Sequence, residues 1–504
     1  MISRGFFKSS MIYSIVGALP YASGFLLLPW FTHLLTPQQF GINALYIALM
    51  YFIQIISSYG MDMSVSVLYF DYKDDKARLR EFLGTVFIGI AILGAFTFMV
   101  FSLGGLRLFN FVFKSSDFIE LFPFGLFTII SGVFNSVFKT YSSLLIYQQR
   151  PVRFLWLNLS NFVLTIAASL VLLYLCPFTL YGPILGRLIP AVVVASISLA
   201  LVGREYGLSW NPAYVKKIVT FSTPIVIYAL LTWVVTYIDR FLIVSLMGDT
   251  TYVGIYDIAV KLVIGLDLVM TGLVNTINPK IYSIWKDRDL HESNTEINRY
   301  YNGITALFLL VIPLFVILAP ILIPLVIYKP IYYQAFGFLA ILAAGYATRV
   351  WFYMFLAPLM FFKKTAALPR VFMISAIFNV VVGIVLIHYF GLIGAVWTNF
   401  MIKPVQALLM YLECRKVYTF KLNPWKIFYT PVIFILVVLI SETLAPAHLK
   451  FQIEIGQFIV AVLLVYFAYR KELVPLLNKF RHVFPAVLIL ALSSNPTIRL
   501  IELM

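Results

Sequence analysis

The sequence has few charged residues. Only 12% of its 504 residues are Asp, Glu, Lys or Arg, whereas 62% are hydrophobic. In a typical soluble domain roughly 25% of the residues are charged. So few charges cannot cover the surface of a water-soluble fold of this size, and the chain is therefore expected to lie in a lipid bilayer.

Residues suited to metal, redox or covalent chemistry are also rare. The two cysteines, Cys176 and Cys414, are expected on opposite faces of the membrane, so no disulfide is predicted. The five histidines are scattered without the spacing of a metal site. The sequence also lacks a nucleophile-elbow motif and a Walker-type phosphate loop. We therefore predict no enzyme, cofactor or metal site, and no direct use of ATP.

The chain does contain a series of apolar segments of about 20 residues, the length that crosses a ~30 Å hydrocarbon core. The segment that begins at Met11 is longer than the ~7–15-residue apolar region of a signal peptide, so we expect it to remain as the first helix. The predicted fold is an all-α, multi-pass membrane protein of about 14 transmembrane helices. Their centres lie near residues 22, 56, 93, 131, 165, 193, 232, 266, 312, 348, 381, 402, 436 and 462.

The net charge of +16 comes from basic clusters between the apolar segments. This pattern is typical of the cytoplasmic loops of membrane proteins and not of nucleic-acid binding. With a cytoplasmic N-terminus, 27 of the 37 lysines and arginines fall in cytoplasmic segments. The opposite face holds only four, which are Arg107, Lys114, Lys329 and Lys450. Both termini are therefore predicted to be cytoplasmic.

Two parts of the chain echo each other. LLTPQQFGINAL at 34–45 resembles LMGDTTYVGIYDI at 246–258, and the apolar pair around 165–193 resembles the pair around 381–402. We predict two six-helix bundles related by a pseudo-two-fold repeat, followed by two further transmembrane helices and a cytoplasmic tail. Their ranges are 1–203, 211–416 and 425–504. Parallel repeats of this kind place a substrate site between the halves, near the middle of the membrane.

Several stretches carry a family resemblance. LLTPQQFGINALYI, GMDMSVSVLYFDYKD, YIDRFLIVSLMGDTTYVGIYDIAVKL and FNVVVGIVLIHYFGLIGAVWTNF resemble hairpins of the bacterial oligosaccharide flippases, over about residues 10–415. These O-antigen and exopolysaccharide transporters belong to the multidrug/oligosaccharidyl-lipid/polysaccharide exporter superfamily. The resemblance implies a protein of the bacterial inner membrane that moves an undecaprenyl-diphosphate-linked oligosaccharide from the cytoplasmic to the periplasmic leaflet. It also implies membrane lipids and the polysaccharide polymerase machinery as partners.

Ionisable residues inside the predicted helices point to the site, because each costs about 2.5–3.5 kcal/mol at mid-membrane unless it has a partner or a wet cavity. The basic ones outnumber the acidic ones, which favours a cavity for an anion such as a diphosphate. The bases are Lys139, Arg187, Arg240, Lys261, Arg349 and Lys403, and the acids are Asp62, Asp239, Asp257 and Asp267.

Arg349 and Lys403 have no acid within a turn of their own helices, so we predict that they bind substrate. The other predicted substrate ligands are Lys139, Lys261, Arg240, Tyr346, Tyr353 and Asn399. Ion coupling is assigned to Asp62, which has no base near it in sequence, and to Asp239 and Asp257.

Alternatives stay open for several of these residues. Arg240 and Asp257 lie at equal depths on either side of a turn and could form a structural ion pair, and Asp257 could pair with Lys261. Arg187, near the outer end of its helix, could extend to the membrane surface. Asp62 could be a neutral, hydrogen-bonded carboxyl.

Polar residues three or four apart form narrow stripes on five predicted helices. We expect these stripes to line a water-filled cavity, although interhelical hydrogen bonding is an alternative. The stripes are Gln54, Ser58, Asp62 and Ser66; Asn135, Lys139 and Ser143; Tyr228, Thr232, Thr236 and Arg240; Tyr346, Arg349 and Tyr353; and Asn399, Lys403 and Gln406.

Three rival functions remain. A lipid II-type flippase would bind a similar lipid diphosphate. A cation-coupled multidrug exporter of the same fold would need a carboxylate-centred site, and the first predicted helix has no acid. A polysaccharide polymerase or ligase would need a substantial external loop, whereas the predicted external loops are short.

Overall fold

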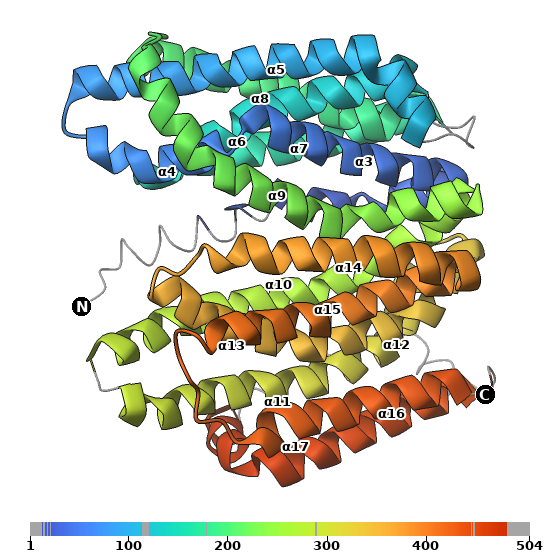
Figure 1. Cartoon of the computed structure of the whole chain (residues 1–504). Helices are drawn as coiled ribbons and strands as arrows, with labels where there is room; N and C mark the ends of the chain where they lie inside the picture. Colours follow the sequence, from blue (N-terminus) through green and yellow to red (C-terminus); the bar gives the residue numbers. More distant parts are fainter. Residues whose placement is uncertain are drawn as a thin grey trace. The chain divides into compact units, whose positions relative to one another are not determined.

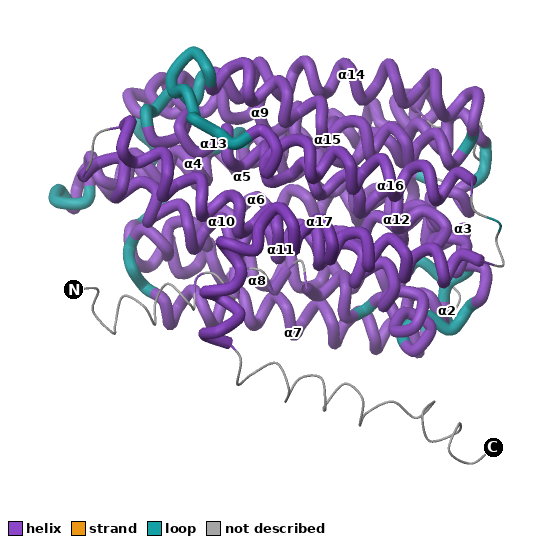
Figure 2. Tube along the Cα trace, turned by 90° about the horizontal axis from the view of Figure 1, so that it is seen from below, coloured by secondary structure: helices purple, strands orange, loops and turns teal. Residues whose placement is uncertain are grey.

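The computed structural model describes residues 13–480 except 14–15, 18, 21, 113–119, 178, 288–289, 445 and 447–448. Over these residues the elements are helices joined by short loops, without a strand (Figures 1 and 2). The long helices are α3 (Pro37–Ser58), α4 (Met61–Tyr72), α5 (Lys76–Val112), α6 (Leu126–Tyr147), α7 (Pro151–Leu175), α8 (Tyr181–Tyr206), α9 (Pro212–Met247), α10 (Thr250–Asp287), α11 (Leu290–Leu322), α13 (Arg349–Phe361), α14 (Ala367–Phe390), α15 (Leu392–Cys414), α16 (Thr430–Leu444) and α17 (Lys450–Phe480). Short ones are α2 (Leu28–Leu34), α12 (Phe336–Ala344), η1 (Leu121–Gly125), η2 (Ile323–Leu325), η3 (Pro330–Ala335), η4 (Gly345–Thr348) and η5 (Trp425–Tyr429).

The prediction of an all-α, multi-pass membrane protein is confirmed. Within the described residues, 12 helices are long and apolar enough to cross a membrane, and they coincide with 12 of the predicted segments. The segment predicted near residue 266 is α10, which is 38 residues long. The first predicted helix lies partly outside the described residues, as do Lys114 and both ends of the chain.

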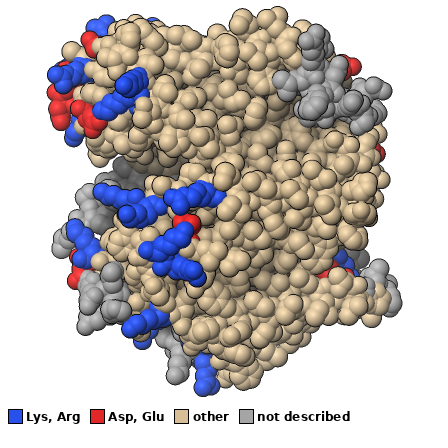
Figure 3. All heavy atoms as spheres, viewed as in Figure 1, with Lys and Arg blue, Asp and Glu red and all other residues tan. Residues whose placement is uncertain are grey.

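The molecular surface fits a lipid environment. The face drawn in Figure 3 is free of charged side chains over most of its area. Large apolar side chains stand exposed on the helices, for example Leu175 at 72%, Tyr389 at 74% and Phe467 at 74%. Water would not stabilise such a surface, whereas hydrocarbon does, so these helices face lipid.

The helices pack into two compact units. Unit 1 comprises Met1–Ile264, Ala319–Leu342 and Thr365–Gln406, and unit 2 comprises Gly265–Leu318, Ala343–Lys364 and Ala407–Met504. Within unit 1, α7 packs on α8, α3 and α8 pack on α6, and α9 packs on α14 (Figure 1). These units do not follow the ranges 1–203, 211–416 and 425–504, so the division into two repeated bundles stays a prediction.

The helix predicted around residue 56 is broken in two. Tyr59 (φ 44°) and Gly60 (φ 67°) take left-handed conformations, which end α3 and start α4. A left-handed residue is easily accommodated at Gly60, because glycine has no Cβ. A Cβ there would also lie only 3.3 Å from the carbonyl oxygen of Ser222 on α9. The break therefore lets α4 run close along α9.

The two echoed turns of the sequence meet in unit 1. Thr36 caps α3 in a reciprocal capping box with Gln39, and Asp249 accepts a hydrogen bond of 2.7 Å from the backbone N–H of Thr251 at the start of α10. Gly41 and Gly254 follow at equivalent positions in the two turns. A Cβ on Gly41 would overlap the Thr250 carbonyl oxygen, so α3 and α10 approach backbone to backbone.

We expect Gly41→Ala to destabilise the protein by about 1–3 kcal/mol, because backbone atoms of α10 occupy the position of the new methyl group. The thermal unfolding temperature of the detergent-purified protein measures the effect. Gly272→Ala is the matched control, since no atom lies within 4 Å of its added Cβ and alanine favours a helix. Equal unfolding temperatures for the two variants would contradict the close approach.

Candidate functional site

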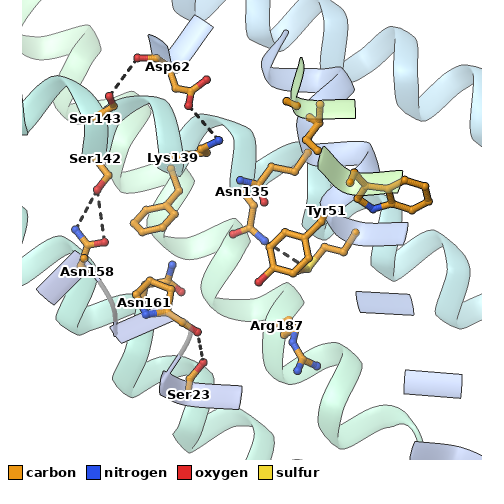
Figure 4. Close-up of a pocket in the computed structure, with 18 of the residues that line it drawn as sticks. Ser23, Tyr51, Asp62, Asn135, Lys139, Ser142, Ser143, Asn158, Asn161 and Arg187 are labelled. Carbon is orange, nitrogen blue, oxygen red and sulfur yellow. Dashed lines mark hydrogen bonds and ion pairs between the residues drawn. The ribbon is translucent and has the colours of Figure 1, made fainter. Parts of the chain in front are cut away.

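A cavity of about 660 Å³ lies within unit 1 (Figure 4). Helices α3, α4, α6, α7, α8 and α9 contribute to its wall. Amides and hydroxyls on α6 and α7 form one part, and aromatic rings on α3 and α9 form another. The polar residues of α6 and α7 are Asn135, Ser142, Ser143, Asn158, Asn161 and Thr165, and the aromatic ones of α3 and α9 are Tyr51, Tyr228, Trp233 and Tyr237.

The predicted polar stripes lie in this wall only in part. The stripe of α6 lines the cavity completely, as do Gln54, Asp62, Tyr228, Thr232 and Thr236. The predicted stripe residues that do not line it are Ser58, Ser66, Arg240, Tyr346, Arg349, Tyr353, Asn399, Lys403 and Gln406. Ser58 is buried instead, and its hydroxyl donates 3.2 Å to the carbonyl of Ile55, beside the break that ends α3. The spacing therefore located part of the cavity face, on α3, α4, α6 and α9.

Asp62 and Lys139 form an ion pair in the cavity, with 3.0 Å between Nζ and Oδ2 (Figure 4). The Lys139 side chain is 49% exposed and that of Asp62 10%. The carbonyl of Asp62 also accepts a hydrogen bond of 3.1 Å from Ser143. The interpretation of Asp62 as an isolated carboxylate is thus wrong, because α6 supplies a base that is distant in sequence.

Arg187 on α8 faces the same cavity (Figure 4). Its Nη1 donates 3.2 Å to Asn43 Oδ1 and 2.7 Å to the carbonyl of Pro183. Within the described part of the chain, no ion pair joins Arg187 to a carboxylate. Sequence reasoning underrated this residue, because position on a helix does not show which neighbour the side chain faces. Two cations and one carboxylate, Asp62, thus line the cavity among the described residues.

Aromatic residues join α3 to α9 beside the cavity. The rings of Tyr51 and Tyr237 stack with their centroids 5.6 Å apart. Trp233 Nε1 donates 2.7 Å to the carbonyl of Ala48. These flat, amphipathic rings offer surfaces on which the apolar faces of sugar rings can lie, with hydroxyl groups available nearby.

A buried ionic cluster lies outside the cavity wall, where α9 meets α10. Arg240 Nη1 donates 2.7 Å to Asp239, and its Nη2 and Nε donate 3.0 and 3.1 Å to Asp257. Lys261 lies 2.6 Å from Asp257, and the Tyr256 hydroxyl donates to Asp239. The structural ion pair left open by the sequence is therefore present. As a correction, none of these residues lines the cavity, since each is held by partners within the cluster.

Lys403 and Asn399 on α15 extend this cluster. Lys403 Nζ donates 2.5 Å to Asn399 Oδ1, and Asn399 Nδ2 donates 3.1 Å to the hydroxyl of Tyr256. Lys403 is 8% exposed and does not line the cavity. Lys403 thus bonds to Asn399 on its own helix, and Asn399 joins that pair to the α9–α10 hairpin.

Arg349 lies in unit 2, where Asp267 on α10 faces it with 3.4 Å between Nε and Oδ1. Its guanidinium also lies over the rings of Phe352 (4.4 Å) and Tyr353 (5.3 Å). Tyr353 bonds to Thr271 at 3.2 Å. Arg349 has no acid within a turn of its own helix, as the sequence indicated, and its acidic partner comes from another helix.

Tyr346 precedes Arg349 in η4 and is buried. Arg349 and Lys403 belong to different units. Their joint binding of one diphosphate, with Tyr346 and Tyr353 against the sugars, stays a prediction.

Solved structures similar to this one are transporters. A lipid II flippase, MurJ, in an inward closed conformation matches with a TM-score of 0.68 and 14% identity, over 91% of this chain and 99% of that one. An inward-facing multidrug-resistance MATE transporter matches with a TM-score of 0.62 and 15% identity, over 78% and 96%. A MOP superfamily transporter from Pyrococcus furiosus gives 0.56 and 15%, over 82% and 95%. The fold is that of the multi-pass transporters of this superfamily.

A family model described as "Polysaccharide biosynthesis protein" matches residues 6–285, more than half of the chain. The chain belongs to the polysaccharide biosynthesis protein family, which confirms the resemblance noted in the sequence. No curated protein matches it.

The two kinds of ion pair in unit 1 should respond differently to mutation. Arg240→Leu leaves two buried carboxylates without their shared base, and we expect a loss of about 3–5 kcal/mol in stability. Lys139→Leu breaks a half-exposed pair and should lose at most about 1 kcal/mol. Thermal unfolding in detergent, followed by size-exclusion profiles, compares the two. A Lys139 variant less stable than the Arg240 variant would refute the distinction.

Proposed function

We propose that this protein is a flippase that moves an undecaprenyl-diphosphate-linked oligosaccharide, such as an O-antigen or exopolysaccharide unit, from the cytoplasmic to the periplasmic leaflet of the bacterial inner membrane. It would work by alternating access, without covalent chemistry, and with both termini in the cytoplasm. The observation that carries the proposal is the net positive charge of the cavity. Its described lining holds two cations, Arg187 and Lys139, and one carboxylate, Asp62.

The lining suits both parts of such a substrate. The guanidinium of Arg187 can offer a planar pair of donors to a phosphate, and Lys139 a point charge. The amides of Asn135, Asn158 and Asn161 can bond sugar hydroxyls, while the nearby rings cover apolar sugar faces. A volume of about 660 Å³ holds a diphosphate with its first sugars but not a long polymer.

The Asp62–Lys139 pair offers a route to ion coupling. A diphosphate that attracts Lys139 draws it away from Asp62, and a carboxylate left alone in the membrane is unfavourable. Asp62 would then take up a proton or a metal cation and release it when Lys139 returns. The ion-coupling roles predicted for Asp239 and Asp257 have less support, because both are held by Arg240.

Two alternatives share the fold. A lipid II-type flippase would use the same diphosphate chemistry, and one of the similar structures is such a protein. Membership of a polysaccharide biosynthesis family favours an oligosaccharide instead. A multidrug exporter would need a carboxylate available to a cationic drug, whereas the lining carboxylate, Asp62, already pairs with Lys139. The polysaccharide polymerase machinery is the expected partner.

We expect Arg187→Gln to lower surface polymer at least tenfold in cells that depend on this protein, because the diphosphate loses its planar charged partner. Arg187→Lys, which keeps the charge, should be partly active. Surface polymer is measured by immunoblot, with membrane abundance of the protein as the normalisation. Lys216→Gln removes an exposed charge of α9 and should have no effect. Normal surface polymer in Arg187→Gln would reject the site.

Asp62→Asn should uncouple transport from the ion gradient, because asparagine can neither release a proton nor hold a cation by charge. Initial rates of flipping of a fluorescent lipid-linked oligosaccharide, in vesicles with and without an imposed gradient, provide the test. We expect the wild type to respond to the gradient severalfold and the variant not at all. A variant that responds as the wild type does would exclude Asp62 from coupling.

A further inference from the structure

A second cavity, of about 600 Å³, lies in unit 2, where the segment that joins α15 to η5 passes over the first turns of α11. Its lining is basic and amide-rich: Arg299, Lys421 and Lys426 with Asn298, Asn302 and Asn423. No carboxylate lines it among the described residues, and it shares no lining residue with the cavity of unit 1.

Amides of α11 hold the joining segment in place. Asn294 Oδ1 accepts 3.2 Å from the backbone N–H of Lys421 and 3.2 Å from the hydroxyl of Tyr418. Asn298 Nδ2 donates 2.5 Å to the carbonyl of Lys421. Further along, the Asn423 side chain accepts 3.0 Å from the N–H of Trp425. The backbone that carries Lys421 is therefore fixed before any ligand binds, which lowers the entropy lost on binding.

The position of this cavity along the helices is that of lipid headgroups. In α11 the lining residues Thr295–Asn302 are followed directly by an apolar run from Ile304, and the apolar residues of η5 and α16 follow Asn423 and Pro424, so the lining stands where both helices enter the bilayer. Trp425 lies in sequence between the lining residues Pro424 and Lys426, and its ring centroid is 5.8 Å from that of Tyr429. The two side chains are 57% and 55% exposed. Tryptophan and tyrosine favour the membrane–water interface, because their rings are apolar and their N–H or O–H groups are polar.

We propose that this cavity binds the phosphate of an anionic phospholipid headgroup on the predicted cytoplasmic face, apart from the transport cavity. Three cations without a carboxylate in the lining attract an anion, and a guanidinium with amide N–H groups matches phosphate oxygens. The exposed rings of Trp425 and Tyr429 favour a lipid over free phosphate, because they would lie against acyl chains and glycerol while the phosphate sits in the cavity.

The test uses the full-length protein in detergent and short-chain dioctanoyl phosphatidylglycerol as the probe, with tryptophan fluorescence as the binding signal. Dioctanoyl phosphatidylcholine and inorganic phosphate are the comparison probes. Wild-type protein should bind phosphatidylglycerol at least tenfold more tightly than either. Arg299→Gln/Lys421→Gln should weaken this binding about 30-fold, equal to about 2 kcal/mol at 1.4 kcal/mol per factor of ten.

The matched control is Lys216→Gln/Lys364→Gln, which removes the same charge from exposed positions outside the cavity and should leave binding unchanged. Arg299→Lys, which keeps the charge, should bind within a few-fold of wild type. If the double variant does not fold, Arg299→Gln alone takes its place and should weaken binding severalfold, and unchanged binding in it would overturn the site. Unchanged phosphatidylglycerol binding in the double variant, or equal losses in the control, would overturn the site. Inorganic phosphate binding as tightly as phosphatidylglycerol would overturn the assignment to a lipid.

Discussion

Inside the hydrocarbon layer there is no water to solvate a charge, so each ionised side chain must find its counter-charge or a wet cavity within the protein. This constraint accounts for most of the intramembrane charges described here. Arg240 is enclosed by Asp239 and Asp257, Lys139 meets Asp62, and Arg349 meets Asp267. Arg187 satisfies the rule differently, through amide and carbonyl oxygens and an open cavity.

The distribution of these charges separates structure from function in unit 1. The α9–α10 cluster is closed on itself, because Asp239 and Asp257 both bond to Arg240 and leave it 3% exposed. Its polar groups bond to one another and hold the hairpin. In the cavity, Asp62 and Lys139 form an ion pair whose lysine side chain is 49% exposed. Arg187 adds a positive charge that no carboxylate neutralises within the described chain. An anionic substrate would complete that balance, whereas it would have to break existing pairs in the cluster.

Backbone geometry shapes the cavity as much as side chains do. The break at Tyr59 and Gly60 turns one predicted helix into α3 and α4, and it brings Ser64 of α4 within 2.6 Å of Ser222 on α9. At the echoed turns, Gly41 and Gly254 let α3 and α10 touch through their backbones. Helices in a membrane associate through such close contacts of small residues, since lipid provides no hydrophobic drive between them.

The sequence by itself determined the membrane environment, the helical class, nearly all transmembrane segments and part of the cavity face, on α3, α4, α6 and α9. Hydrophobic length and residue spacing are properties of one helix, so both can be recognised in the sequence. Gln54 and Asp62, and Thr232 and Thr236, show the spacing. Only the tertiary structure decided which charges meet. Lys139 reaches Asp62, Asp267 reaches Arg349 and Arg187 enters the cavity, because helices far apart in sequence pack side by side. Pairing across helices depends on rotation and depth, which no local pattern encodes.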